Sequence, residues 1–370
     1  MKYSAVAIIL TFVFMEDQKT ILVAPLNWGL GHATRCVPVI KALQENNYNP
    51  LLASDGAALA LLRKEFPELE TVELPSYNIT YSKKASGFKW KLLLDSPKML
   101  KTIKAEKKLV KKLVANHQIQ GIISDNRLGV RNKNIPSAYI THQLSVLTGS
   151  TTWLSTKLHL DFVRKFDVCW VPDLAGSANL SGKLGHPEQL PLGVTYMGPL
   201  SRMNKLHLRI RYDILVLLSG PEPQRTYLEE KLMKELHVTD KKVLFVLGKV
   251  EEKQHCYNKG NFRVYNFMST KALEKAINES ELIISRSGYT TIMDLALLEK
   301  KAFFIPTPGQ YEQEYLAKKL DESGVVPYCN QEEFTFKKLN NVSNYSGLKS
   351  LQQEVDFNSL FRLFERKGKL

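Results

Sequence analysis

The sequence predicts an α/β protein built from two doubly wound domains, and three observations lead to that prediction. Short, continuous apolar segments alternate with segments of helical periodicity, which indicates parallel sheets covered by helices on both faces. The alternation begins near residue 20, is interrupted by a polar, basic stretch at 201–212, and then restarts. At 370 residues the chain is also too long for one ordinary core.

Residues 1–200 are expected to form the first domain. Its expected strands are "TILVAPL", "NPLLAS", "ETVEL", "GIISD", "SAYITH", "DVCWVPD" and "VTYMGPL". Helices are expected at about 32–46 and 56–65, because apolar residues recur there at helical spacing. The Gly/Pro-rich segment between the last two strands is typical of an ordered loop near a domain boundary.

Residues 201–347 are expected to form the second domain, and 348–370 a final amphipathic helix that packs back on the first. The expected strands are "DILVLLSG", "KKVLFVLG", "FRVYNF", "ELIIS" and "KAFFIP", with helices at 224–236, 270–279, 290–299 and 310–322. Two such Rossmann-like domains in tandem direct the carboxyl ends of their strands toward a common cleft, where open α/β sheets bind ligands.

Composition and cysteine usage indicate a globular protein of a reducing compartment. Hydrophobic residues make up 44% of the chain and charged residues 24%, as in folded globular proteins. The cysteines have no CxxC or other metal-binding spacing, so we expect structural thiols, no metal site and a cytoplasmic location. These cysteines are Cys36, Cys169, Cys256 and Cys329.

The chain opens with an apolar segment at 4–14. This segment is too short to span a bilayer, which takes about 20 apolar residues, and no small-residue cleavage site follows it. We interpret Met15 as the natural start and expect residues 1–14 to carry no function.

The net charge of +14 is concentrated in the segment 83–112, which has eleven lysines and only two acidic residues. Ser96-Pro97 has the pattern of a helix start, and apolar residues recur after it at helical spacing. We therefore expect a basic amphipathic helix that follows a loop bearing Phe88 and Trp90.

Two interpretations of this basic segment remain open. Its lysines can form the solvated face of a helix packed on its own domain. Alternatively, they attract an anionic surface at the inner face of the cell membrane, while Phe88 and Trp90 insert at the interface. Nucleic acid is not an expected partner, because we find no recognised binding motif and no arginine-rich segment interleaved with aromatic residues.

The first loop suited to chemistry is "LNWGLGHATR", which joins the first strand to the first helix. Gly29 and Gly31 allow close backbone approach, and the helix start offers N–H groups and a positive dipole end to an anion. His32 at that start titrates near neutrality and is a candidate general base. Thr34 replaces the third glycine of a dinucleotide fingerprint, although Asp55 stands about where its ribose-binding acid would be.

Three further strand ends carry polar groups. Asp125 and His142 follow neighbouring strands and can face the cleft, the first as a second candidate base and the second as an acceptor contact; each can equally cap the loop that follows it. In "LSGPEPQRT", Ser219-Gly220 forms a tight turn, and Arg225 with the following helix start can hold phosphate oxygens.

The segment "LIISRSGYTTIMD" at 282–294 places a polar corner between a buried strand and a helix. Ser287 and Gly288 form the corner, and Tyr289 and Thr290 present N–H groups at the helix start. Asp294 shares a helix face with Thr290. A carboxylate placed there can accept two ribose hydroxyls while the amides hold phosphates. The sequence assigns no role to the arginine of this corner.

The next strand-to-helix corner is also polar. Gln310, Gln313 and Glu314 lie there, and amide and carboxylate groups are suited to the hydroxyls of a sugar. One polar corner is compatible with a capped, exposed turn. Four consecutive strand ends with such groups favour a ligand site.

The segment "SRSGYTTIMDLALLEKKAFFIPTPGQYEQEYLAKKL" resembles the donor-binding region of glycosyltransferase family 28, within the GT-B fold. The resemblance is specific over about 262–327 and extends to "GLGH" and "VTYMGPL". It implies that Asp294 binds the ribose of a UDP-sugar, that the backbone at Met268 contacts the base, and that Gln313 and Glu314 bind the sugar. It also implies that His32 lies near the reacting centre.

The resemblance predicts an inverting enzyme that moves a hexose, N-acetylglucosamine or a related sugar, from a UDP-sugar to an acceptor hydroxyl that is lipid-linked or part of an envelope glycan. There is no Asp-x-Asp motif, so neither a metal ion nor another cofactor is expected. The chain departs from the family at Ser219-Gly220-Pro221, in place of a Gly-Gly-Ser turn, and at Glu314, in place of a second glutamine.

Three alternatives remain. A nucleotide-sugar epimerase of the same architecture would consume the donor without an acceptor. A non-catalytic nucleotide-sugar-binding subunit would keep Asp294 but would tolerate loss of His32. A nicotinamide dehydrogenase is disfavoured by Thr34.

Overall fold

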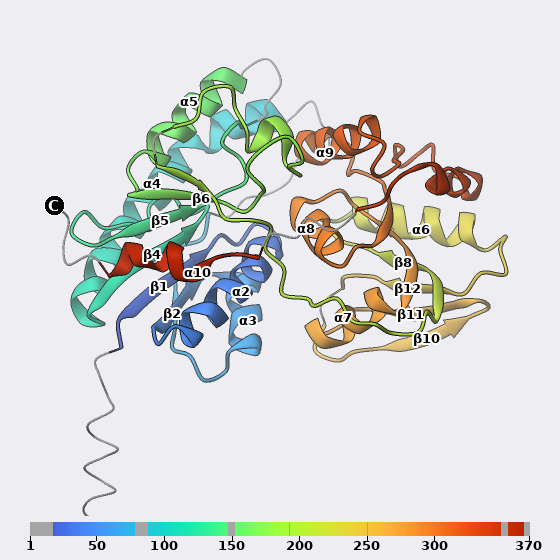
Figure 1. Ribbon diagram of the computed structural model, residues 1–370, viewed down its shortest axis with the longest axis horizontal. Helices are drawn as coiled ribbons and strands as arrows, with labels where there is room; N and C mark the ends of the chain where they lie inside the picture. Colours follow the sequence, from blue (N-terminus) through green and yellow to red (C-terminus); the bar gives the residue numbers. More distant parts are fainter. Residues whose placement is uncertain are drawn as a thin grey trace, which may run out of the picture.

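The computed structural model describes residues 18–77, 88–146, 152–191, 193–249, 251–348 and 354–365, with the backbone alone for 88–96. Within these residues the chain forms two sheets, each covered by helices, in two lobes that lie side by side (Figure 1). The predicted α/β class with two Rossmann-like domains is therefore confirmed.

The first sheet has the strand order β3-β2-β1-β4-β5-β6-β7, and all of its pairs are parallel. Its strands are β1 (Thr20–Pro25), β2 (Asn49–Ser54), β3 (Thr71–Glu73), β4 (Ile119–Asp125), β5 (Ser137–Ile140), β6 (Val168–Val171) and β7 (Val194–Tyr196). The strand order reverses between β1 and β4, where Pro25 is paired with Asp125. Ligands of open α/β sheets bind outside such a switch point.

Helices cover both faces of this sheet because its central strands are apolar throughout. Ile21 and Val23 of β1 pack in a cluster that includes α2, whereas Leu22 and Ala24 pack in a second cluster that includes α4. The helices of this domain are α2 (Gly31–Glu45), α3 (Gly56–Glu65), α4 (Phe88–Asn116) and α5 (Thr152–Val163), with a 3-10 turn η3 (Gly182–Leu184).

The second sheet has the order β10-β11-β9-β8-β12-β13 and switches between β8 and β12. Its strands are β8 (Tyr212–Leu217), β9 (Val243–Val246), β10 (Cys256–Lys259), β11 (Phe262–Tyr265), β12 (Ser280–Ser285) and β13 (Lys301–Phe304). Around it lie α6 (Gln224–Leu236), α7 (Thr270–Asn278), α8 (Tyr289–Leu297), α9 (Tyr311–Glu322) and η4 (Phe336–Asn344). The antiparallel edge strand β10 was not predicted, because all of its residues are exposed and it lacks an apolar face.

The expected start of the basic helix was wrong. Helix α4 begins at Phe88, so Phe88 and Trp90 belong to its first turn rather than to a loop, and Pro97 lies inside the helix. The physical reason is that lysines and a leucine run fill residues 89–94, and these residues favour helix enough to continue it past the proline. The side chains of Phe88 and Trp90, like residues 1–14, lie outside the described part of the chain.

The end of the described chain packs on the first domain. Helix α10 (Phe357–Phe361) and the turn η5 (Arg362–Phe364) place Phe361 and Phe364 in the core cluster of β1 and α2. The Phe364 ring lies 6.2 Å from the ring of Trp170. A Cβ atom at Gly121 would come within 2.4 Å of Phe364, so β4 needs glycine where this ring lies against it.

We expect Phe364→Ala to lower the free energy of unfolding by about 3 to 5 kcal/mol, because it removes a buried ring and leaves a cavity. Urea unfolding followed by tryptophan fluorescence measures the change. Glu365→Gln, at the exposed neighbouring residue, is the matched control. A loss below about 1 kcal/mol, typical of surface substitutions, would show that this segment is not part of the core.

Candidate functional site

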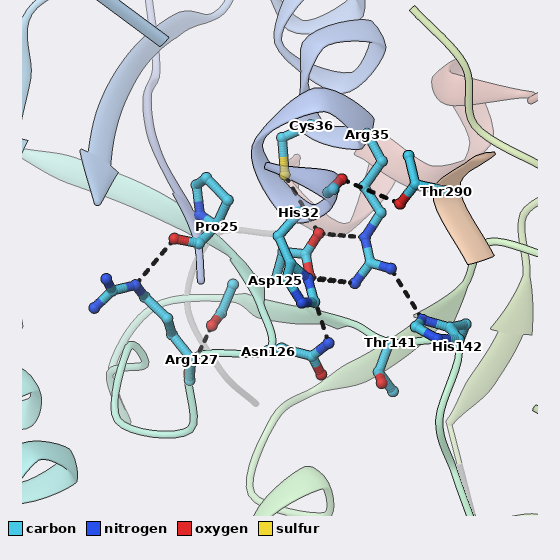
Figure 2. A network of polar contacts seen from close by, with 12 residues as sticks. Pro25, His32, Arg35, Cys36, Asp125, Asn126, Arg127, Thr141, His142 and Thr290 are labelled. Carbon is cyan, nitrogen blue, oxygen red and sulfur yellow. Dashed lines mark hydrogen bonds and ion pairs between the residues drawn. The ribbon is translucent and has the colours of Figure 1, made fainter. Parts of the chain in front are cut away.

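The two candidate bases lie in direct contact at the switch point of the first sheet. His32 stands in the first turn of α2 and Asp125 ends β4, and His32 Nδ1 lies 2.8 Å from Asp125 Oδ1 (Figure 2). The Asp125 side chain is fully buried, while that of His32 is 14% exposed. The ring therefore rests on a buried carboxylate and keeps a small part of its surface exposed.

The electrostatic surroundings keep this pair in the form His32 neutral and Asp125 ionised. Burial opposes ionisation of Asp125, but Arg35 and His32 outweigh it and hold the pKa of Asp125 well below its usual range. Burial lowers the pKa of His32, and the nearby Arg35 also lowers it, while Asp125 opposes the shift. A neutral imidazole with a free nitrogen is the form that accepts a proton.

Arg35 is the residue of this site that sequence reasoning missed. Its Nε donates to Asp125 Oδ2 at 2.5 Å, and its Nη2 donates to Asp125 Oδ1. Arg35 Nη2 also lies 2.9 Å from His32 Nδ1. Asp125 can accept from a protonated Nδ1, whereas Arg35 Nη2 and Asn126 Nδ2, the latter at 3.5 Å, can only donate to an unprotonated one. The tautomer in which Nδ1–H donates to the ionised Asp125 leaves Nε2 as the acceptor. Its position one helical turn after His32 was the available signal.

The predicted glycine loop brings the two domains into contact. Gly31 O accepts a hydrogen bond from Thr290 Oγ1 of α8 at 3.3 Å, and a Cβ atom at Gly31 would lie 2.8 Å from that oxygen (Figure 2). Gly29 has φ +72°, a left-handed conformation that glycine adopts at no steric cost. The helix starts of α2 and α8 therefore meet, one from each domain.

The other residues at the start of α8, from Ser287 to Tyr289, bond to the first domain or to a neighbouring segment of their own domain. Gly288 begins α8 without a side-chain cap. Ser287 Oγ donates to the Gln313 carbonyl at 2.7 Å. The Tyr289 hydroxyl donates to the Pro172 carbonyl of the first domain at 2.8 Å, and its ring stacks on His142 at 4.2 Å between centroids. His142, the predicted acceptor contact, thus lies where the two domains meet.

The arginine of this corner, Arg286, is a structural tie. It is 1% exposed, and its guanidinium donates to the carbonyls of Ile305, Pro306 and Gln224 and to the Gln331 side chain. Burial lowers the pKa of Arg286 to about 10. These bonds join the corner to the β13–α9 loop and to the start of α6.

Asp294 lies at the junction between α8 and the segment that follows β7. Its Oδ1 accepts from Ser201 Oγ at 2.6 Å. Burial raises the pKa of Asp294 to about 6, although the Ser201 hydrogen bond and the charge of Arg202 oppose the rise. Arg202 in turn donates to Glu65 of α3 at 3.2 Å. A half-buried carboxylate with a raised pKa is a common feature of functional sites.

The polar residues before and within α9 mainly order their own corner. The Thr307 amide donates to Gln313 Oε1 at 2.8 Å, and Gln313 Nε2 donates to Gln310 Oε1 at 2.7 Å. The Gly309 amide donates to Glu314 Oε1 at 2.7 Å. Three residues of α9 reach the first domain. Tyr315 accepts from the Lys183 amide at 2.7 Å, Lys319 donates to the Asn179 carbonyl at 2.6 Å, and Glu312 accepts from His142 at 2.9 Å. Sequence reasoning passed over Glu312 although it lies between the residues it named.

The remaining predicted donor contacts are not joined to this site by any direct contact that the structure shows. Ser219 and Gly220 form an exposed turn after β8, with Gly220 at φ +101°. Arg225 was expected to face a phosphate, but its guanidinium donates to the Leu247 carbonyl at 2.9 Å and pairs with Glu222. Met268 is half-buried against the core of the second domain.

Asp55, the candidate ribose acid of a nicotinamide site, already has partners within the first domain. It is paired with Arg127 and accepts from Asn27 Nδ2 at 3.1 Å. The part of the chain that the structure describes has no cluster of three metal-ligating residues. Among the same described residues, no helix has the length and apolar character of a membrane span.

A cavity of about 570 Å³ lies beside α9 rather than at the meeting point of α2 and α8. It is lined by Thr152, Tyr311, Glu314, Tyr315, Lys318, Tyr328 and Asn330. Glu314 is the one residue that it shares with the predicted donor site. We therefore define the site by the hydrogen-bonded residues at the switch points.

This chain is similar to known proteins in the sequence of one domain and in its overall fold. Residues 224–359 match the Glycosyltransferase family 28 C-terminal domain. The fold is similar to that of the glycosyltransferase SnogD from Streptomyces nogalater, with 14% identity, a TM-score of 0.59, and 94% of this chain and 95% of that chain covered. No curated protein matches the chain in sequence.

Two other solved structures have the same architecture. One is MurG from Acinetobacter baumannii, with 15% identity, a TM-score of 0.57, and 95% of this chain and 100% of that chain covered. The other is described as a UDP-N-acetylglucosamine 2-epimerase from Listeria monocytogenes, with 8% identity, a TM-score of 0.55, and 88% of each chain covered.

The chain has the GT-B fold of these solved glycosyltransferases, and the domain model that it matches is that of a glycosyltransferase family. More particularly, the second half of the chain is similar to the C-terminal domain of glycosyltransferase family 28. The resemblance seen in "SRSGYTTIMDLALLEKKAFFIPTPGQYEQEYLAKKL" is confirmed, since this segment lies within the matched residues.

We expect Asp294→Asn to stabilise the protein at pH 7.5 by about 1 to 3 kcal/mol, because a tenfold change in an ionisation constant corresponds to about 1.4 kcal/mol. The folded pKa of about 6 lies above the ordinary value of an aspartate, so the ionised carboxylate destabilises the fold, and stability falls as pH rises from about 4 to 6. The amide keeps an oxygen that can accept from Ser201.

Thermal unfolding of the variant and the wild type at pH 7.5 and pH 4.5 tests this expectation. The gain in unfolding temperature should be larger at pH 7.5. Asp240→Asn, at an exposed loop, is the control for removing one carboxylate. An equal gain at both pH values would contradict the raised pKa of Asp294.

Proposed function

We propose that the protein is an inverting, metal-independent hexosyltransferase that moves N-acetylglucosamine or a related sugar from a UDP-sugar to an acceptor hydroxyl. The observation that carries the proposal is the contact between Gly31 and Thr290. It brings the helix start beside His32 next to the helix start expected to hold the donor diphosphate. In this proposal the base of the first domain, His32, is therefore adjacent to the leaving-group site of the second domain.

His32 acts as the base in this proposal. Its Nε2 takes the proton of the acceptor hydroxyl as that oxygen attacks the anomeric carbon, and the bond from that carbon to the diphosphate breaks on the opposite face. The resulting imidazolium is stabilised by Asp125, which accepts the Nδ1–H at 2.8 Å. Asp125, our reserve base, instead orients the ring, because its oxygens are engaged by Arg35 and His32.

The donor side is assigned to α8. The uncapped helix start at Gly288 to Thr290 offers N–H groups and the positive dipole end to the diphosphate. Asp294, one helical turn after Thr290, accepts hydrogen bonds from the ribose hydroxyls, which replace or join the hydrogen bond from Ser201. Arg225 is left out of this assignment because its guanidinium already has internal partners.

An epimerase is the second candidate, since a protein described as one has the same architecture. The two reactions differ in their requirement for an acceptor. An epimerase would change or release the sugar of its donor without one.

Nucleotide-sugar binding is the first test. Thermal-shift measurements with uridine, guanosine and thymidine diphosphate sugars, each with and without magnesium, should show stabilisation by a uridine compound that is independent of the metal. No stabilisation by any of these compounds would overturn the proposal. Release of free sugar or its epimer without acceptor would favour the second candidate.

We expect His32→Ala to lower kcat by about 10²- to 10⁴-fold, the usual contribution of a general base, while the nucleotide Kd stays within about twofold. Because burial lowers the pKa of His32, the acid limb of the wild-type pH profile should lie below the ordinary histidine pKa. Calorimetry and initial rates from pH 5 to 8 measure both. Unchanged turnover would indicate a binding subunit instead of an enzyme.

Membrane association remains part of the proposal for the basic helix. Its lysines at 101, 104, 108, 111 and 112 are exposed, and Met99 and Leu100 expose apolar surface on the same helix. This supports a peripheral position at the inner face of the cell membrane, close to a lipid-linked acceptor.

We expect replacement of the six lysines in 101–112 by glutamine to abolish binding to vesicles that contain anionic lipid, since each lysine near the surface adds about 1 kcal/mol. Co-sedimentation at low and moderate salt measures the loss. Six exposed lysines of the second domain, replaced in the same way, are the control. Retained binding would favour a solvated face.

A further inference from the structure

Glu312 joins the two domains through both oxygens of its carboxylate. It lies in the first turn of α9, and its Oε1 accepts from His142 Nε2 at 2.9 Å. Its Oε2 accepts from Gln143 Nε2. Both partners follow β5 of the first domain. A carboxylate that accepts from two neutral donors orients them without adding a buried ion pair.

The ring of His142 is held on three sides. Its Nδ1 accepts from Arg35 Nη1 at 3.0 Å, and its Nε2–H donates to Glu312, so the contacts define one neutral tautomer. Tyr289 of α8 stacks on its face with planes 5° apart. Two of these three partners come from the second domain. His142 therefore has all of its contacts only when that domain is docked.

Arg35 carries the contact onward to the candidate base. Its Nη1 bonds to His142, while its Nε and Nη2 bond to Asp125, which accepts from His32 (Figure 2). Asp125 is 0%, Arg35 1% and His142 5% exposed. An uninterrupted set of polar contacts thus runs from α9 of one domain to the imidazole of the other.

The exposure of the Glu312 end suits a contact that forms and breaks. Its side chain is 31% exposed, so separation of the domains returns the carboxylate to water at modest cost. At the buried end, Arg35 and Asp125 stay together within the first domain. Domain opening would release His142 from Glu312 and Tyr289, and the Arg35 side chain would lose a fixed partner.

We propose that Glu312 and His142 are positioning residues that latch the closed domains and, through Arg35, fix the orientation of Asp125 and His32 for proton transfer. This rests on the proposed glycosyl transfer. With this latch, His32 is correctly oriented only when the second domain, which carries the donor, is docked on the first. Neither residue touches the reacting atoms. A mere interface contact would change stability without changing turnover.

The test compares Glu312→Ala and Glu312→Gln with the matched control Glu322→Gln on the same helix, where the side chain is 64% exposed. We expect Glu312→Ala to lower kcat about 10- to 100-fold, as small misplacements of catalytic groups do, with the UDP Kd within about twofold. Glu312→Gln keeps an acceptor for His142 and should recover part of the rate. Unchanged kcat in Glu312→Ala would overturn the proposal.

A second measurement separates the latch from the chemistry. The radius of gyration from solution scattering with UDP should rise in Glu312→Ala and stay at the wild-type value in Glu322→Gln. If the wild type transfers no sugar, the proposed function fails. The scattering measurement then tests the latch by itself, and an unchanged radius of gyration in Glu312→Ala would refute it.

The double variant Glu312→Ala with His142→Ala should lose no more activity than the worse single variant, because the two residues act as a unit. Additive losses would count against the latch.

Discussion

The pairing of Arg35 with Asp125 is the interaction on which the site depends. Both side chains are buried at the switch point of the first sheet, and an uncompensated charge at either position would be strongly destabilising. Their mutual bonds keep Asp125 ionised and leave one of its oxygens directed at His32. The same guanidinium holds His142, which meets the second domain. One buried ion pair therefore sets both the protonation of the candidate base and its link to the neighbouring domain.

The boundary between the domains is built from helix starts and loops, because these carry the polar groups that packed strands lack. Tyr289 and Thr290 of α8 and Glu312 of α9 all bond to groups that follow strands of the first sheet. The Tyr289 hydrogen bond is buried, whereas those of Thr290 and Glu312 are partly exposed. In the proposed function, opening of this interface admits the donor and closure covers it. Asp294 illustrates the cost of this arrangement, since its carboxylate is kept half-buried with a raised pKa.

Much of this could be predicted from the sequence, for physical reasons. Continuous apolar strands and helical periodicity survive in any context, so the two sheets and the helix at 224–236 were predicted correctly. His32 and Asp125 were found because residues after parallel strands share one edge of a sheet. Arg35, Glu312 and the ties of Arg286 were not predicted, since each depends on which distant groups the fold brings within hydrogen-bond distance. The same holds for Arg225, whose partners Leu247 and Glu222 occupy the guanidinium that the sequence directed at a phosphate.

The position of Phe361 and Phe364 in the first domain has a consequence for synthesis of the chain. These rings fill a core whose other buried members come from residues 21 to 200, so that core is incomplete until residue 364 has been added to the chain. The sheet of the second domain, which spans 212–304, precedes both rings in the sequence. The scaffold that carries the candidate base His32 is therefore completed only after the chain has supplied the whole sheet of the second domain.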